Sequence, residues 1–276
     1  MSGRNLDPGT VASFGDEWER FDQSRLSEEE SRRIFGEYFG IFPWERLPQD
    51  AEGFDMGCGS GRWARWVAPR IGRLHCIDPS SALEVAKRAL AAFTNVEFHA
   101  ASVGEAVLPP ASQDFGYSLG VLHHVPDTAA ALESCVELLK PGAPLLLYLY
   151  YAFDDRPAWF RALWRCSDFA RRAIVRLPPA LKHAATDAIA FCLYLPLARG
   201  SRLLERLGMD VRDVPLSYYR DHGWYTLRTD ARDRFGTPLE RRFTRDQIRR
   251  MMQDAGLDGI RFSEAAPYWC ALGFRR

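Results

Sequence analysis

A nine-residue stretch from Gly53 to Gly61, GFDMGCGSG, decides the fold of this 276-residue chain. Its apolar beginning predicts a short strand that ends near Met56, and a helical pattern follows from Gly61 to Val67. Glycine lets the backbone turn sharply and approach a bound molecule closely, and the first turn of a helix offers unpaired N–H groups. The stretch therefore predicts a ligand-binding loop between a strand and a helix.

Short apolar runs alternate with helical patterns on both sides of this loop. Such alternation is typical of a parallel sheet with helices on both faces. The fold class is therefore α/β, with a Rossmann-like, mostly parallel sheet. The expected strands are residues 53–56, 74–77, 96–99, 115–119, 144–151, 260–263 and 269–274, and the expected helices between them are residues 61–67, 81–93 and 128–139.

The segments outside this alternation have helical patterns. Ser27 with Glu30, and Thr244 with Gln247, have the spacing of capping boxes at helix starts. We expect one α/β domain with an insertion rather than two independent domains. Its parts are an N-terminal helical cap at 1–50, a ligand-binding core at 51–153, a helical insertion at 154–235, and a C-terminal helix with the last two strands at 236–276.

The net charge of zero hides an asymmetry between the two halves of the chain. Residues 1–150 carry 13 basic and 21 acidic residues, whereas residues 151–276 carry 23 basic and 15 acidic residues. The basic half uses arginine almost throughout and opens with two expected helices, at 157–176 and 180–208. This usage reflects either genomic base composition or a half of the protein that meets something anionic.

Neither the N-terminus nor the cysteines indicate export. Residues 1–10 lack the basic-then-apolar pattern of a signal peptide. The longest apolar run, residues 188–198, is well short of the ~20 residues that a spanning helix needs. The six cysteines form no C-x-x-C pair, and five of them lie in apolar segments, as reduced core residues do. We expect a cytoplasmic protein with no membrane span and no metal ligands.

Asp78 ends the strand that follows the glycine-rich loop, 21 residues after Gly57. A carboxylate in this place can accept both hydrogen bonds of a ribose 2′,3′-diol, although an aspartate before Pro79 also suits a turn or a helix cap. Arg62 stands where the dinucleotide fingerprint G-x-G-x-x-G needs its last glycine, and the Gly-Lys-Ser/Thr of a phosphate-binding P-loop is absent. The loop therefore favours a nucleoside over a pyrophosphate.

The chain carries four motifs in a fixed order: residues 55–61, Asp78-Pro79-Ser80, residues 118–127 (SLGVLHHVPD) and residues 138–142 (LLKPG). Together they resemble the motifs of the class I S-adenosylmethionine-dependent methyltransferases. The resemblance is closest to the broad type 11 group of small-molecule enzymes, which includes the ubiquinone-type enzymes, and it covers roughly residues 50–150. It implies S-adenosylmethionine as the cofactor and a seven-stranded sheet with one antiparallel strand.

The resemblance also implies positions around the cofactor. Asp55 and Gly57 are expected beside the methionine amino and carboxylate groups, Gly59 beneath the cofactor and Asp78 on the ribose. The other residues expected to bind the cofactor are Cys58, Pro79, Ser102, Val103, Leu119 and Gly120.

One departure from the family lies after the third strand, where an acid usually binds the adenine amino group. Here Ala101-Ser102-Val103 occupies that place. The Ser102 hydroxyl is expected to accept the hydrogen bond instead, and the Val103 N–H is expected to donate to the adenine ring. Cofactor binding should survive this change.

Two histidines stand where the transferred methyl group is expected. Methyl transfer is an in-line displacement, and alignment of the reactants contributes roughly 7–11 kcal/mol in favourable cases. A hydroxyl or ammonium nucleophile must also lose a proton, and imidazole suits this task because it titrates near neutrality. His124, beside His123, is the first candidate for the base, and His222 is the second. The alternative is that one or both histidines only pack beside the cofactor.

The segment 216–235 interleaves aromatic rings with arginines. Tyr219, Arg220 and Arg228 are its candidates for binding the acceptor, because rings favour a planar body and an arginine fork binds carboxylate or phosphate. Trp18 and Phe21 are expected to complete the pocket wall, with the insertion as a lid that excludes water. The acceptor is then a ring-containing, anionic small molecule. A surface turn with amphipathic rings is the alternative.

The sequence thus predicts a methyltransferase of class EC 2.1.1 that methylates an oxygen or nitrogen of a small molecule. The alternatives are a macromolecular acceptor (RNA or protein), a cofactor-binding module without activity, and, by fold analogy alone, an NAD-linked oxidoreductase. Enzymes for exocyclic base amines carry Asn/Asp-Pro-Pro-aromatic after the fourth strand, whereas residues 118–121 here read SLGV, so no DNA substrate is expected. The acceptor atom and the oligomeric state stay open.

Overall fold

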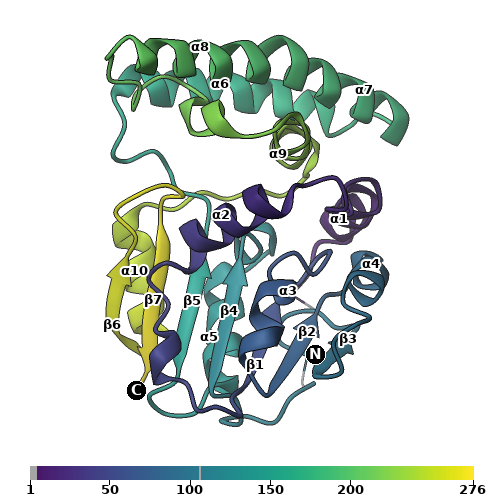
Figure 1. Ribbon diagram of the computed structural model, residues 1–276, viewed down its shortest axis with the longest axis vertical. Helices are drawn as coiled ribbons and strands as arrows, with labels where there is room; N and C mark the ends of the chain where they lie inside the picture. Colours follow the sequence, from purple (N-terminus) through teal and green to yellow (C-terminus); the bar gives the residue numbers. More distant parts are fainter. Residues whose placement is uncertain (1–4, 106) are drawn as a thin grey trace. The chain divides into compact units, whose positions relative to one another are not determined.

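The computed structural model describes residues 5–105 and 107–276, and the chain forms two compact units (Figure 1). The expected insertion at 154–235 falls within the second unit, whereas the short segment 24–30, expected in the N-terminal cap, also belongs to it. The first unit comprises Met1–Gln23, Ser31–Ala152 and Leu239–Arg276, and the second comprises Ser24–Glu30 and Phe153–Pro238.

The first unit is built on a seven-stranded sheet with the order β3-β2-β1-β4-β5-β7-β6. Strands β1 to β5 pair in parallel, and β7 pairs antiparallel with β5 and β6. This arrangement confirms the predicted Rossmann-like fold class with one antiparallel strand. The strands are β1 (Glu52–Met56), β2 (Arg73–Ile77), β3 (Val96–His99), β4 (Phe115–Leu119), β5 (Pro144–Tyr148), β6 (Leu257–Phe262) and β7 (Cys270–Arg275).

Apolar clusters cover both faces of this sheet. One face packs against α5 (Thr128–Leu138) and α10 (Arg245–Asp254), and the other packs against α2 (Glu28–Phe39), α3 (Ala64–Val67) and α4 (Ala82–Ala89). The alternation of strand side chains supplies both clusters, because successive residues point to opposite faces. Parallel strands place all their carboxyl ends at one edge of the sheet, and the glycine-rich loop and Asp78 lie at that edge.

Two strand boundaries differ by three residues from the sequence expectation, for reasons of pairing. Strand β5 ends at Tyr148 rather than 151, since its neighbour β4 ends at Leu119 and the chain beyond pairs with Phe243 instead. Strand β6 begins at Leu257 rather than 260. Its first part contains a register shift against β7 and exposed polar side chains, which hide the apolar alternation in the sequence.

The second unit is helical and has a small apolar interior. Helices α7 (Pro179–Ile189) and α8 (Leu195–Arg206) are joined by one π-helical segment, and α9 (Trp224–Gly236) contacts α6 (Ala158–Ile174) and α7 (Figure 1). Its buried apolar cluster is Ala190, Tyr194, Ala198, Leu227, Ala231 and Phe235. Among the helices that the structure describes, none combines the length and apolar character needed to cross a membrane.

Only one of the two predicted capping boxes is complete. At α10 the Thr244 hydroxyl accepts from the Gln247 N–H, and the Gln247 side chain accepts from the Thr244 N–H. At α2 the Ser27 hydroxyl accepts from the Glu30 N–H, but the Glu30 carboxylate accepts from the Gly223 N–H at 2.9 Å and the Thr226 hydroxyl at 2.8 Å. The Glu30 side chain therefore bonds to residues distant in the chain instead of to the N–H of Ser27.

The prediction that five of the six cysteines are core residues is wrong by one. Cys58, Cys76, Cys135 and Cys270 are buried, whereas Cys166 and Cys192 are exposed. The two exceptions lie in the second unit, in segments whose sequences are as apolar as those of the core. Both cysteines lie in helical segments, as the sequence predicts, but on the side of each segment that is exposed to solvent.

Candidate active site

The glycine-rich loop turns through three residues with positive φ, at Gly57 (82°), Gly59 (53°) and Gly61 (77°). Gly57 has no room for a side chain, because a Cβ there would lie 2.4 Å from Val121 Cγ1. The N–H groups of Gly57 and Cys58 donate to the Ile77 carbonyl at 2.7 and 3.2 Å, which ties the loop to the end of β2. The sequence predicted this strand-to-helix turn, and the backbone geometry explains its glycines.

Asp78 connects the glycine-rich loop with the turn after β2. Its Oδ2 accepts from the Gly59 N–H at 2.9 Å, and its Oδ1 accepts from the N–H and hydroxyl of Ser80 at 2.8 and 2.6 Å. Burial raises the pKa of this carboxyl, and the bonds from Ser80 and Gly59 oppose that rise. A carboxylate has about four acceptor sites, so Asp78 keeps capacity for a ribose diol while it fixes the loop.

Asp55 is fully buried beneath this loop, and burial raises its pKa to about 8. The nearby Tyr117 hydroxyl lowers the pKa of Asp55, while the charge of Asp78 raises it. Neither carboxylate oxygen has a hydrogen bond of ordinary geometry among the residues that the structure describes. A buried carboxyl in this state would be stabilised by a bound cation.

The residues after β3 contain an acid that the sequence analysis missed. Ser102 donates both its N–H, at 2.6 Å, and its hydroxyl, at 2.9 Å, to Glu105 Oε2. The carboxylate of Glu105 therefore lies beside Ser102, although Glu105 comes three residues later in the chain than Ser102. The signal was present as an Ser-x-x-Glu spacing, the pattern of a capping box, but no helix follows it in the described residues.

His124 follows β4 and has a defined tautomer. Its Nδ1 lies 2.6 Å from the Leu239 carbonyl oxygen, which can only accept, so Nδ1 carries the proton and Nε2 presents a lone pair. Phe14 packs edge-on against this ring at 4.9 Å. The sequence named His124 as a base, but its positioning partner, Leu239, lies 115 residues away and carried no signal.

His123 has a different environment. The side chain is fully buried, and its ring centroid lies 3.9 Å from those of both Tyr150 and His124. Burial, with the charges of His124 and Arg242, lowers the pKa of His123 well below its usual value. No described residue hydrogen-bonds to either of its ring nitrogens. A neutral packing residue fits this geometry better than a base does.

Comparison with known proteins identifies the family. The sequence profile of the family described as "Methyltransferase domain" matches residues 54–147. A ubiquinone biosynthesis O-methyltransferase of Xanthomonas campestris pv. campestris is 33% identical over 180 residues, which cover 64% of this chain and 71% of that protein. The chain belongs to the class I S-adenosylmethionine-dependent methyltransferases, in the type 11 group.

Two other matches differ in how much of each chain they cover. A ubiquinone biosynthesis O-methyltransferase of Saccharophagus degradans is 37% identical over 94 residues, 33% of this chain, and the chain spans only 40% of that protein. The crystal structure of a possible exported protein from Bordetella parapertussis has a TM-score of 0.52 at 15% identity, over 95% of this chain and 79% of that one. This structural likeness supports the fold.

The loop of this methyltransferase fits its cofactor on two observations. Asp55 is a buried carboxyl without an ordinary hydrogen bond, which the ammonium group of S-adenosylmethionine would supply. A Cβ on Gly120 would meet no described atom within 4 Å, so the backbone there has space for a bound molecule. The other expected cofactor residues of the methyltransferase lie at the same edge: Cys58 and Leu119 are buried, Gly120 is half-buried with φ 80°, and Pro79 is exposed beside Asp78.

Helix α1 (Pro8–Arg20) covers this edge of the methyltransferase sheet. Its Gly15 lies against Ser81 after β2, its Trp18 lies against Gly59, and the Ser81 hydroxyl donates to Glu19 at 2.9 Å. Trp18 is half-buried in this position, whereas Phe21 is almost completely buried. The proposed wall role therefore suits Trp18 better than Phe21, since a pocket wall must present surface to its ligand.

The other predicted site residues of the methyltransferase lie in the second unit. His222 is buried, with its ring 4.7 Å from that of Tyr218 and 5.8 Å from that of Tyr219. Arg220 is paired with Glu205 at 2.8 Å, and Arg228 makes a two-pronged pair with Asp187 at 2.9 Å for each bond. Their parts in catalysis and acceptor binding stay predictions.

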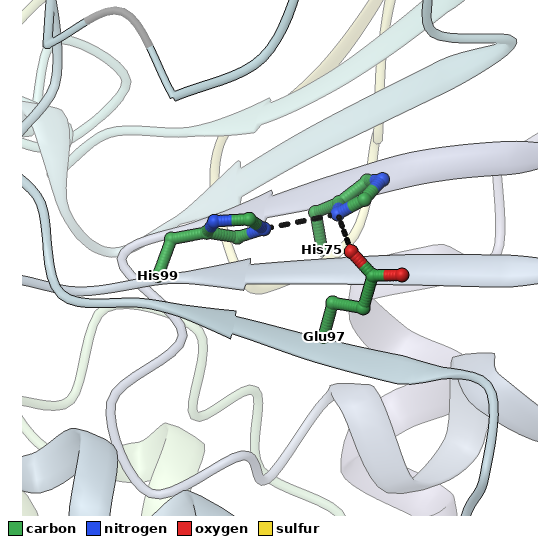
Figure 2. A group of neighbouring side chains, drawn as sticks. All are labelled: His75, Glu97 and His99. Atoms are coloured by element: carbon green, nitrogen blue, oxygen red, sulfur yellow. Dashed lines mark hydrogen bonds and ion pairs between the residues drawn. The ribbon is translucent and has the colours of Figure 1, made fainter.

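One cluster in the methyltransferase has the composition of a metal site. His75 Nδ1 lies 3.0 Å from His99 Nε2 and 3.5 Å from Glu97 Oε2 (Figure 2), and these three ligand atoms all lie within 4.8 Å of one another. His75 Nε2 is held 2.7 Å from Glu52, whose pKa this contact lowers. The group could hold a divalent cation, and its hydrogen bonds join β1, β2 and β3. The sequence analysis named no metal ligand because this grouping depends on strand register.

Proposed function

We propose that this methyltransferase transfers the methyl group of S-adenosylmethionine to an oxygen or nitrogen of a small-molecule acceptor, with His124 as the general base. The observation that carries the proposal is the bond from His124 Nδ1–H to the Leu239 carbonyl at 2.6 Å. It fixes the imidazole in the tautomer whose Nε2 can receive a proton. The bond joins the residues after β4 to the chain that leads into α10, at the edge where the glycine-rich loop lies.

The site residues of the first unit would each have a part in this reaction. The cofactor supplies an electrophilic methyl carbon on its sulfonium. Asp55 would pair with the ammonium of the methionine part, Asp78 would accept from the ribose hydroxyls, and Glu105 with Ser102 would receive the adenine amino group. As the acceptor formed its bond to the methyl carbon, the carbon–sulfur bond would break and its electron pair would stay on the sulfur of S-adenosylhomocysteine. The proton of the acceptor would pass to His124 Nε2 and later to water.

The acceptor class rests on the relatives and on the arginines of the second unit. The two curated relatives described above are named as ubiquinone biosynthesis O-methyltransferases, which favours oxygen and a ring-bearing acceptor. An anionic acceptor would have to displace Glu205 from Arg220 or Asp187 from Arg228, because both arginines already have carboxylate partners. We therefore propose a ring-bearing acceptor, and the experiment compares a neutral acceptor with an anionic one.

The first experiment measures S-adenosylhomocysteine formation with paired ring hydroxyls. Catechol and 3,4-dihydroxybenzoate share a nucleophile and differ in a carboxylate. Turnover with either compound, with one methyl group recovered on oxygen, supports the proposal, and a preference for the benzoate that Arg220→Gln abolishes supports an anionic acceptor. Calorimetric titration with S-adenosylhomocysteine provides the control that the preparation binds its cofactor.

The second experiment separates the two candidate bases. An asparagine at position 124 can still donate to the Leu239 carbonyl but has no basic nitrogen, so His124→Asn should lower kcat about 10²–10⁴-fold. Affinity for S-adenosylhomocysteine should stay within about twofold, because His124 is not among the residues assigned to the cofactor. His222→Asn is the matched variant. If it removes turnover and His124→Asn does not, the assignment of the base to His124 is wrong.

A further inference from the structure

Helix α6 exposes several large apolar side chains to solvent, which is unusual for a helix of a globular protein. Its exposed side chains include Trp159, Leu163 and Phe169, and Phe169 is 80% exposed. Its interior side carries Asp168 and Arg171, of which Arg171 is buried. Helices of globular domains normally bury the apolar stripe and expose the charges. Helix α6 departs from this arrangement, because the residue that it buries is Arg171, whereas Phe160, Trp164 and Ile174 are only half-buried.

The continuous helical segment from α7 to α8 also exposes large apolar side chains, although it buries Ala190, Tyr194 and Ala198. It exposes Leu181, Phe191, Leu193, Leu197 and Leu203. Its buried side chains include Lys182, Thr186 and Ser201. Across the residues that the structure describes, every exposed large apolar side chain lies between Trp159 and Trp224, in the second unit.

The polar interior of this unit is held by specific partners. Arg171 donates to Asp168 at 2.8 Å and to the carbonyl of Thr237 at 2.8 Å, and Arg228 pairs with Asp187. Hydrogen bonds from Arg171 and Arg172 lower the pKa of Asp168, although burial alone would raise it. These charges are therefore satisfied inside the unit, whereas its outward large apolar side chains have no apolar cover among the described residues. Large exposed apolar patches mark interaction sites.

The charge of the segment indicates what covers it. Residues 158–209 carry nine basic and three acidic residues, a net charge of +6. The exposed apolar side chains are interleaved with exposed arginines, namely Arg165, Arg172, Arg176, Arg202 and Arg206. A second copy of the chain would bring the same positive charges to the interface, whereas an anionic surface would neutralise them. Arginine and exposed Trp, Phe and Leu together are typical of helices that lie in a membrane interface.

We propose that α6, α7 and α8 dock this methyltransferase on the surface of an anionic lipid bilayer. Trp159, Phe169 and Phe191 enter the boundary between headgroups and acyl chains, and the arginines contact lipid phosphates. The helices lie along the surface and do not cross it, which agrees with the lack of a spanning helix in the described residues. This docking is separate from methyl transfer: it rests on the exposed side chains of α6 to α8, and vesicle binding is measured without an acceptor.

The experiment uses the full chain and sucrose-loaded vesicles that are sedimented. Vesicles of phosphatidylcholine with 40% phosphatidylglycerol should bind the protein, vesicles of pure phosphatidylcholine should bind it at least tenfold more weakly, and added salt should reduce the difference. The triple variant Trp159→Ser/Leu163→Ser/Phe169→Ser should lower the partition coefficient at least about 100-fold, because three apolar side chains no longer leave water. These residues are exposed, so the variant should fold, and circular dichroism checks this.

A charge variant keeps the test informative if the triple variant is unstable. Arg165→Gln/Arg206→Gln should weaken binding to the anionic vesicles about 25-fold, since each arginine near such a surface contributes roughly fivefold. The matched control, Arg88→Gln/Arg250→Gln, makes the same change of net charge at exposed positions of the first unit and should alter binding less than about threefold.

Three results would overturn the proposal. The first is wild-type protein that stays in the supernatant with anionic vesicles. The second is a stable dimer in light scattering that the triple variant converts to monomer, which would show that a second copy covers the helices. The third is equal loss of binding in the two charge variants, which would show attraction by net charge alone.

Discussion

Helix α4 in the first unit and helix α6 in the second distribute their side chains in opposite ways. Helix α4 buries Leu83 and Val85 and exposes Lys87, whereas α6 buries Arg171 and exposes Phe169. Both helices have strong apolar periodicity, so sequence pattern alone does not distinguish them. The comparison teaches that amphipathic periodicity locates a face but does not say whether that face meets a protein core or something outside the chain.

The largest effect that sharpens this comparison comes from the buried arginine of α6. Arg171→Met should lower the free energy of unfolding of the second unit by about 3–5 kcal/mol, because Asp168 would stay buried without its main partner. The matched variant, Arg172→Met, removes an arginine that bonds to the same carboxylate but is 67% exposed, and should cost no more than about 1 kcal/mol. Hydrogen exchange of α6 and α9 measures both. Equal losses would mean that the interior charges of this unit do not hold it together.

A second effect, in the first unit, depends on pH. The folded protein holds a proton on Asp55 up to about pH 8, whereas the unfolded chain releases it near the ordinary pKa of 3.8. Between these values the folded state binds more protons, so the free energy of unfolding should fall as pH rises through this window. Asp55→Asn cannot titrate and should stabilise the cofactor-free protein at pH 8 by about 2–5 kcal/mol.

Thermal unfolding from pH 5 to pH 8 tests this sign. Asp50→Asn, at an exposed position, is the control and should leave the pH dependence unchanged. The same Asp55→Asn variant should bind S-adenosylmethionine more weakly than the wild type does. A variant that is less stable than the wild type at pH 8 would contradict the burial-raised pKa.

The smallest effect tests the outward faces directly. Leu163→Ala, at a side chain 51% exposed in α6, should change stability in buffer by less than about 0.5 kcal/mol. Leu83→Ala, at a side chain 3% exposed in α4, makes the same chemical change in the first unit and should cost about 2–5 kcal/mol. Chemical denaturation measures both. A large loss at Leu163 would show that the face of α6 is already covered within the protein.

Much of the cofactor site could be predicted from the sequence, because its determinants are local. The glycines of the loop are needed where φ is positive, and Asp78 follows its strand directly, so spacing alone indicates them. Glu105 could not be predicted from the family pattern, because that pattern has its acid at residues 101–103 and Glu105 lies three residues after Ser102. The contact between His124 and Leu239 could not be predicted, because it joins segments 115 residues apart.

The sequence by itself determined the α/β class, the strand-to-helix turn and the cofactor, since each depends on residues that are neighbours along the chain. Only the tertiary structure decided which side of α6 to α8 faces outward, which half of the Ser27–Glu30 box forms, and that His75, Glu97 and His99 meet. The physical reason is shared. A periodic pattern gives the direction of a side chain relative to its own helix or strand, whereas its partners are set by strand register and by the packing of segments distant in the chain.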